Sequence, residues 1–391
     1  MRFGAAITAL STLQAALDDL IPRSLAGLEG EKPDLAVLHV THHFESELEP
    51  LVAAVRERTR ADVLIGCTAE GVIGPGTEIE RSAGVSLWVA SLPGARVRGL
   101  YIHPSDLENV ESQTELERVM RVKSTDEPSF LLLADPVFTP YVMGLLEAIG
   151  KVYPKRPVFG GMASGADGPG QSALFLDDDV FREGAVAVAL WGDVEIRPIV
   201  SQGCRPVGKP FIITAAERNK IVSLGGRPAL SVLTEVFRAA PEQDQKLMSN
   251  GIFIGRAIDE YRDEFQRGDF LIRNVIGADK EDEAIYMADL ARVGTTVQFH
   301  VRDADSADED LRSLLTREAG GTAGGLMFSC NGRGTRMFPE AHHDAGAFRS
   351  ALGDLPVAGF FCAGEIGPVA GQNFIHGHTA SIALFKPRHS L

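Results

Sequence analysis

The pattern of apolar and polar positions repeats three times along the chain. In each copy an apolar run is followed by a polar turn, a stretch with helical periodicity, a second apolar run ending in a glycine-bearing loop, and a closing apolar run. The opening runs are Leu35–Val40, Phe130–Ala134 and Leu326–Phe328. Because these runs are apolar at consecutive positions, they predict strands that are buried on both faces. Three matching successions indicate a repeated structural unit.

The order of elements within the unit predicts the type of sheet. A strand–helix–strand crossover of this length favours two parallel strands with a right-handed connection. The short glycine-rich return that follows suits an antiparallel third strand. We therefore expect an α/β fold of mixed β-sheets layered with helices, built from repeated β-α-β-loop-β units. The expected helices span about 44–60, 141–151 and 345–352, and the closing strands span 85–90, 185–190 and 380–385.

Small and polar residues follow the expected parallel strands. Open α/β sheets bind ligands outside the carboxyl ends of such strands. We therefore expect the loops of the three copies to gather at one place and to form a pocket. The loops are Cys67–Gly71, Met162–Gly165, Ser329–Gly334 and Cys362–Gly367, and the first and the last share a Cys-x-x-Glu spacing.

The segment between the second and third copies follows a different pattern. It predicts a hairpin at 211–214 with 221–224 and a helix at 229–240. Three further strands follow at 252–254, 270–276 and 296–301, and a second helix at 305–315. The turn residues Gly225–Pro228 predict a domain boundary. Since 391 residues are too many for one ordinary domain, we expect two domains, 1–228 and 229–391.

Composition and charge narrow the classes of function. The chain has 38 basic and 53 acidic residues, a formal net charge of −15, and no run rich in Lys or Arg. Because a nucleic-acid binder needs a basic surface, we expect no nucleic-acid partner. No apolar run reaches the length of a bilayer span, and Gln14, Asp18 and Asp19 interrupt the N-terminal apolar stretch. Four cysteines without paired spacing do not make a disulfide framework, so we expect a cytoplasmic protein without membrane contact.

Several stretches resemble a known family. They are Phe328–Gly334, Pro356–Phe360, Gly364–Pro368, Arg273-Asn274 and Val297–Asp303. The chain resembles the FIST family, with an N-terminal and a C-terminal FIST domain, from about residue 34 to residue 385. The resemblance implies a sensory module of signalling proteins, proposed to bind small ligands such as amino acids. Relatives often carry an output module, for which we see no room outside 34–385, so we expect a signal to leave through a protein partner or through oligomerisation.

The polar residues of the loops suggest how a ligand is held. A guanidinium offers a bidentate fork to a carboxylate, and a glutamate can bind an ammonium group, so a small zwitterion fits this set of side chains. The alternative is that the arginines tie loops together and the glutamates cap backbone amides. The predicted ligand-binding residues are Cys67, Thr68, Glu70, Ser164, Arg273, Asn331, Arg333, Cys362 and Glu365.

Two other functions stay open, a thiol- or carboxylate-dependent enzyme and a protein-interaction scaffold. Cys330 has Arg333 nearby and a helix ahead, which can lower a thiol pKa, although an unpaired cysteine is commonly a small buried hydrophobe. Glu70 and Glu365 could act as an acid–base pair. Ser164 lacks a G-x-S-x-G motif, and no glycine loop has a nucleotide-binding motif. His376-x-His378 lacks a third ligand. We expect no metal and no cofactor, and we favour a binding protein over an enzyme.

Overall fold

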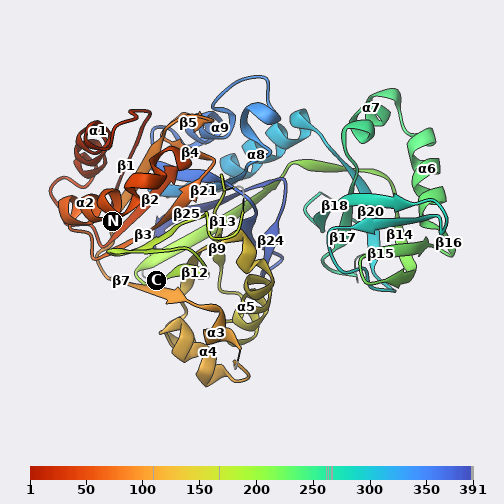
Figure 1. Cartoon of the computed structure of the whole chain (residues 1–391), viewed down its shortest axis with the longest axis horizontal. Helices are drawn as coiled ribbons and strands as arrows, with labels where there is room; N and C mark the ends of the chain where they lie inside the picture. Colours follow the sequence, from red (N-terminus) through yellow and green to blue (C-terminus); the bar gives the residue numbers. More distant parts are fainter. Residues whose placement is uncertain (109, 167, 261, 263, 266, 389–391) are drawn as a thin grey trace. The chain divides into compact units, whose positions relative to one another are not determined.

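The computed structural model describes residues 1–388 apart from 109, 167, 261, 263 and 266. The chain forms two units (Figure 1). The first comprises Met1–Val200, Leu311–Ile375 and Thr379–Leu391, and the second comprises Ser201–Asp310 and His376–His378. Among the described residues, no helix has both the length and the apolar character that a membrane crossing requires.

Each copy of the repeat forms the centre of one six-stranded sheet in the first unit. The opening strand pairs in parallel with the second strand and antiparallel with the closing strand. The expected α/β class with mixed sheets is therefore confirmed. The strands are β2 (Leu35–Thr41), β3 (Val63–Ala69) and β6 (Val85–Ser91) in the first copy, β8 (Ser129–Ala134), β9 (Val158–Met162) and β12 (Ala185–Gly192) in the second, and β21 (Gly324–Cys330), β22 (Val357–Cys362) and β25 (Thr379–Pro387) in the third.

The three sheets exchange hairpins in a ring. Hairpin β4–β5 (Gly71–Gly74, Thr77–Glu80) of the first copy pairs with β22 of the third. Hairpin β10–β11 (Leu174–Leu176, Asp179–Phe181) of the second copy pairs with β3 of the first, and hairpin β23–β24 (Glu365–Val369, Gln372–His376) of the third pairs with β9 of the second. The loop after each second strand therefore passes from one sheet to the next. Strands β1 (Arg2–Thr8), β7 (Ala95–Ile102) and β13 (Val194–Gln202) complete the other edges.

Helices cover the outer faces of the sheets. Helix α2 buries Leu48, Leu51, Val52 and Val55, a stripe of helical periodicity, against strands of the first copy. Helices α1 and α2 lie side by side in Figure 1. The helices of this unit are α1 (Leu13–Ala26), α2 (Leu48–Thr59), α3 (Pro104–Leu107), α4 (Gln113–Met120), α5 (Thr139–Val152) and α9 (His343–Leu352), with 3₁₀ turns at His42–Glu47, Ser124–Asp126, Pro136–Phe138 and Gly334–Arg336; α8 (Ala304–Glu318) runs from the second unit into the first.

The inner faces of all three sheets share one apolar core. Trp88 of the first copy packs against Phe385 of the third, with ring centroids 4.9 Å apart, and Phe159 of the second meets Phe385 edge-on at 6.2 Å. Each central strand is thus buried by helices on one face and by the other sheets on the opposite face. This double burial explains why the opening runs are apolar at consecutive positions.

The second unit contains a seven-stranded sheet that closes on itself, because β14 pairs with both β20 and β15. The predicted hairpin lies within β14 and β15. The division of the chain into domains 1–228 and 229–391 stays a prediction. The elements are β14 (Cys204–Glu217), β15 (Lys220–Leu224), β16 (Arg227–Pro228), α6 (Ala229–Ala239), α7 (Glu242–Asn250), β17 (Phe253–Ala257), β18 (Phe270–Asp279), β19 (Ala284–Met287) and β20 (Thr296–Arg302).

Candidate functional site

One hydroxyl group joins the strand-end loops of all three copies. Ser164, which follows β9, is buried, and its Oγ accepts a hydrogen bond from the Glu70 backbone N–H at 2.9 Å. The same Oγ donates to the Phe361 carbonyl at the end of β22. Because the hairpins cross between sheets here, the ends of β3, β9 and β22 meet at this point. We call the residues around it, together with those at the end of β21, the strand-end cluster.

A buried ion pair lies within the strand-end cluster. Arg333 and Asp344 are fully buried, and the guanidinium donates from Nε to Asp344 Oδ2 at 2.8 Å and from Nη2 to Oδ1 at 2.7 Å. Ser329 also donates to Asp344, and His343 Nδ1 lies 2.8 Å from Oδ1. Burial alone would raise the pKa of Asp344, but the Arg333 charge and hydrogen bonds outweigh it and hold that pKa below its usual range. Asp344 therefore stays ionised at neutral pH.

Arg333 keeps part of its hydrogen-bonding capacity unused. Its Nη1 is buried and has no hydrogen-bond partner among the described residues. The guanidinium carbon lies 5.1 Å from the centre of the Phe338 ring, which stacks on His343. The side chain is thus held on two sides while one nitrogen remains available to an anion.

Glu365, the first residue of β23, is fully buried beside the same arginine. Its Oε2 accepts from the Thr379 hydroxyl at 2.8 Å and from the Thr379 N–H at 3.1 Å. Its Oε1 is buried and accepts no hydrogen bond from a nitrogen or oxygen donor in the described part of the chain. Burial raises the pKa of Glu365 to about 8, although Thr379, Arg333 and Cys330 each favour the charged form. The group is therefore largely protonated at pH 7.

Three cysteines face the same place. Cys330 and Cys362 stand opposite each other on β21 and β22, and Cys67 lies near Cys362. Burial raises the pKa of Cys67 and of Cys362 well above the ordinary value, so both stay protonated. Cys330, next to Arg333 and Arg336, accepts from the Gly332 N–H at 3.4 Å. Across the described residues, no three His, Cys, Asp or Glu side chains are grouped as metal ligands would be.

The Cys-x-x-Glu spacing shared by the first and third copies does not mark equivalent positions. Gly66 is opposite Leu38 and Gly359 is opposite Met327, which aligns these two glycines in the repeat. Cys67 directly follows Gly66, whereas Cys362 comes three residues after Gly359. The two glutamates differ accordingly, since Glu365 is buried and Glu70 is partly exposed.

A partly exposed ion pair covers the strand-end cluster. Arg336 Nη1 donates to Glu70 Oε2 at 2.9 Å and to the Asn331 carbonyl at 2.7 Å, and the Asn331 N–H donates to the Cys362 carbonyl at 2.9 Å. Glu70, Asn331, Arg336 and Phe361 line a depression of only about 10 Å³. That space holds no more than one water molecule.

The side chains of two predicted ligand residues are engaged elsewhere. Thr68 is buried, and its Oγ1 accepts from the Ala173 N–H at 2.9 Å, which fastens β10 to β3. Arg273 belongs to the second unit, where its Nε donates to Asp289 at 3.1 Å. The structure brings together the other seven, namely Cys67, Glu70, Ser164, Asn331, Arg333, Cys362 and Glu365.

Sequence reasoning missed two buried carboxylates, Asp344 beside Arg333 and Glu78 beside Asp344. Asp344 follows two histidines at the start of α9, where it resembles an ordinary acidic first-turn residue. Glu78 lies in β5, and its Oε1 accepts from the Ala345 N–H at 2.9 Å. Burial and the nearby Asp344 charge raise the pKa of Glu78 to about 8. Alternation does not signal the burial of Glu78, because Glu78 and its neighbour Ile79 in β5 are both buried.

Solved structures and curated proteins resemble this chain to different degrees. A crystal structure of cyanuric acid hydrolase from A. caulinodans aligns over 100% of both chains with 10% identity and a TM-score of 0.36. An uncharacterized protein of Mycobacterium tuberculosis is 41% identical over 389 residues, covering 98% of this chain and 100% of its own length. An uncharacterized protein of Mycobacterium bovis is 39% identical over 390 residues, covering 98% and 99%.

Family models match most of the sequence. The FIST N domain matches residues 34–227, and the FIST C domain matches residues 229–368. The resemblance seen in the sequence is therefore confirmed. The chain belongs to the FIST family, whose domains are associated with small-ligand-binding sensory function.

Proposed function

We propose that this protein is a sensor whose ligand is an amino acid or a similar small carboxylate, held at the strand-end cluster. One observation carries the proposal. Arg333 and Glu365 are both fully buried; Arg333 Nη1 has no hydrogen-bond partner among the described residues, and Glu365 Oε1 has no nitrogen or oxygen donor there, with only the Cys330 thiol acting on that carboxyl group besides Thr379 and Arg333. Leaving buried polar atoms unpaired costs about 1–3 kcal/mol each. A ligand with a carboxylate and an ammonium group satisfies both atoms.

The charges around Arg333 suit such a ligand. Asp344 neutralises the guanidinium through Nε and Nη2, and Glu365 is mostly uncharged at pH 7 because its pKa is about 8. A carboxylate at Nη1 adds a second charge-assisted hydrogen bond to the arginine. An ammonium group beside Glu365 favours the ionised carboxylate, so binding near pH 7 releases a proton.

Access to the site links binding to a conformational change. The Glu70–Arg336 ion pair is partly exposed, and exposed ion pairs contribute only about 0–1 kcal/mol, so it separates at low cost. A ligand that binds only the open state shifts the population towards it. The changed loop surface would then be presented to a signalling partner in the cytoplasm.

A thermal-shift screen over the amino acids and small carboxylates tests this function. A ligand at ~100 times its Kd should add about 2.7 kcal/mol to the free energy of unfolding. Glu365→Gln should abolish the shift and leave the unliganded protein near wild-type stability at pH 7, because glutamine imitates the protonated carboxyl group. Glu49→Gln, on the exposed face of α2, is the matched control and should keep the shift.

Two results would contradict the proposal. One is the absence of a shift with every compound, and the other is an equal shift in wild type and Glu365→Gln. Turnover of a compound that disappears in Cys330→Ala would instead favour a thiol enzyme.

A further inference from the structure

A much larger cavity lies at the opposite ends of the same strands. Its volume is about 670 Å³, within the range of about 300–1,000 Å³ typical of small-molecule sites. Ser129 opens β8 and Pro157 directly precedes β9, and both line it. The strand-end cluster, by contrast, follows the carboxyl end of β9. All the lining residues belong to the first unit.

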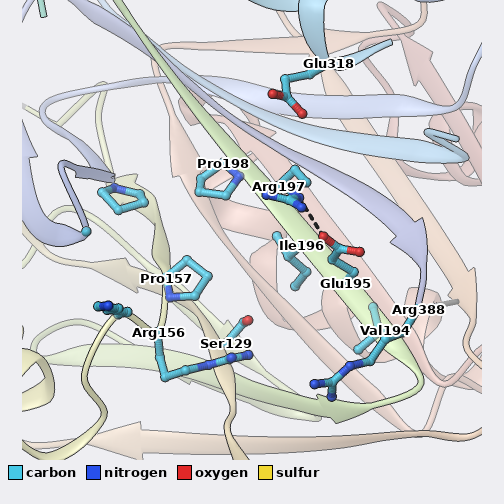
Figure 2. A pocket seen from close by; sticks show the side chains of 13 residues that line it. Ser129, Arg156, Pro157, Val194, Glu195, Ile196, Arg197, Pro198, Glu318 and Arg388 are labelled. Atoms are coloured by element: carbon cyan, nitrogen blue, oxygen red, sulfur yellow. Dashed lines mark ion pairs between the residues drawn. The ribbon is translucent and has the colours of Figure 1, made fainter. Parts of the chain in front are cut away.

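The cavity wall is held by contacts between two copies of the repeat. The Val158 N–H donates to Asn373 Oδ1 at 2.9 Å, and Asn373 Nδ2 donates to the Arg156 carbonyl at 3.0 Å. These bonds tie the turn before β9 to hairpin β23–β24. Strand β13 forms another wall with residues 194–198 (Figure 2). Two hydrogen bonds therefore hold this part of the cavity wall together.

Positive charge is in excess around the cavity, although the whole chain carries a net charge of −15. Its lining includes four cations and two carboxylates, Lys155, Arg156, Arg197, Arg388, Glu195 and Glu318. Both carboxylates already have a cation, since Glu195 pairs with Arg197 at 2.5 Å and Glu318 with Lys386 at 3.5 Å. Lys155 has no ion-pair partner among the described residues.

Two arginines share a single carboxylate. Glu127 lies 3.7 Å from Arg156 and 3.4 Å from Arg388. In Figure 2 the Arg156 guanidinium lies beside Ser129, and Arg388 points towards it from the other side. Burial lowers the pKa of Arg156, and the neighbouring Arg388 lowers it further against the opposing effect of Glu127. An oxyanion between the two guanidinium groups would relieve this repulsion.

We infer that this cavity binds a small ligand with two negative charges, either a phosphate monoester or a dicarboxylate. Arg156 and Arg388 hold the anion, and Lys155 adds a third positive charge. Val194 and Ile196 on β13 and Pro368 of the hairpin also line the cavity. This site is independent of the zwitterion site at the strand-end cluster.

Isothermal titration of the full-length protein tests the inference, with inorganic phosphate, adenosine monophosphate and succinate as probes. At least one probe should bind, and binding should weaken with added salt because the contacts are ionic. Arg388→Met should reduce the affinity about tenfold or more, and Arg388→Lys should restore part of it. Arg388 is exposed near the end of the described chain, so its substitution leaves the core intact. Arg238→Met, at an exposed position of α6, is the matched control and should bind as wild type does.

The outcomes separate the two ligand classes and the two sites. Binding of the phosphates alone, or of succinate alone, assigns the ligand class. Absence of binding by all three probes, or equal affinity in wild type and Arg388→Met, would overturn the inference. Glu365→Gln should leave anion binding unchanged, and Arg388→Met should leave the amino-acid thermal shift unchanged, so either proposal can fail without the other.

Discussion

At the scale of single residues, burial decides the chemistry of the strand-end cluster. Glu78 and Glu365 are raised to pKa values of about 8 chiefly because they are buried. Asp344 is also buried, yet the adjoining Arg333 charge keeps its pKa low. At neutral pH Glu78 and Glu365 are thus mostly protonated, whereas Asp344 is ionised. The residues next to each carboxyl group in the sequence do not reveal this difference, because the groups that contact it in the folded chain come from distant segments.

The two raised pKa values predict how stability depends on pH. In the unfolded chain both glutamates ionise near their ordinary pKa of 4.5, whereas in the folded chain they hold protons up to about pH 8. The folded state therefore binds more protons between these values, and the stability from Glu78 and Glu365 falls as pH rises from about 5 to 8. The double variant Glu78→Gln/Glu365→Gln should lose less stability over that range, by on the order of a few kcal/mol. Urea unfolding at a series of pH values measures this, and parallel pH profiles for both proteins would refute it.

The Arg333–Asp344 pair gives a second prediction at this scale. Asp344→Asn leaves the Arg333 charge buried without its counter-charge, so it should reduce the free energy of unfolding by about 3–5 kcal/mol. Asp354→Asn provides the control, because Asp354 pairs with Arg349 at the surface with 80% of its side chain exposed. The control should change stability by less than about 0.5 kcal/mol. Chemical denaturation measures both, and equal effects would show that the buried pair contributes no more than a surface pair.

At the scale of elements, close contact between parallel strands restricts one position of each repeat to glycine. A Cβ atom built on Gly66, Gly160 or Gly359 would lie 2.0, 1.9 or 1.7 Å from a backbone carbonyl oxygen of the neighbouring opening strand. A backbone oxygen at that distance cannot move aside without breaking the sheet. These glycines therefore fix the approach of the second strand to the first in every copy.

Alanine substitution tests this role. Gly359→Ala should destabilise the protein by about 1–3 kcal/mol or more, because the added methyl group overlaps the Met327 carbonyl. Gly144→Ala is the control, since Gly144 lies in α5 and a methyl group there meets nothing within 4 Å. That change should raise stability by up to about 1 kcal/mol through helix propensity. Thermal unfolding of the two variants measures the contrast, and a neutral Gly359→Ala would exclude the packing argument.

At the scale of the whole molecule, the exchange of hairpins holds the first unit together. Each sheet contains a hairpin from another copy, so no sheet is complete without its neighbour. The same exchange carries the loops after β3, β9 and β22 across the junction, where Ser164 joins Glu70 to Phe361. The basic cavity lies at the other ends of β8 and β9. The first unit thus presents two chemically different places at opposite ends of its strands.

The sequence by itself determined the repeated unit, the mixed sheets and the family, because these depend on local patterns of apolar residues, glycines and short motifs. Only the tertiary structure decided which sheet each hairpin joins, because these pairings link residues far apart in the sequence, such as Val72 with Phe360. It likewise decided that Asp344, the ion-pair partner of Arg333, lies close to Glu78, which is far from it in the sequence. The protonation of Glu365 and the positive excess around Arg156 follow from burial and from neighbours brought close by folding. Electrostatic energies depend on the distance between charges and on their solvent exposure, and the sequence alone gives neither quantity.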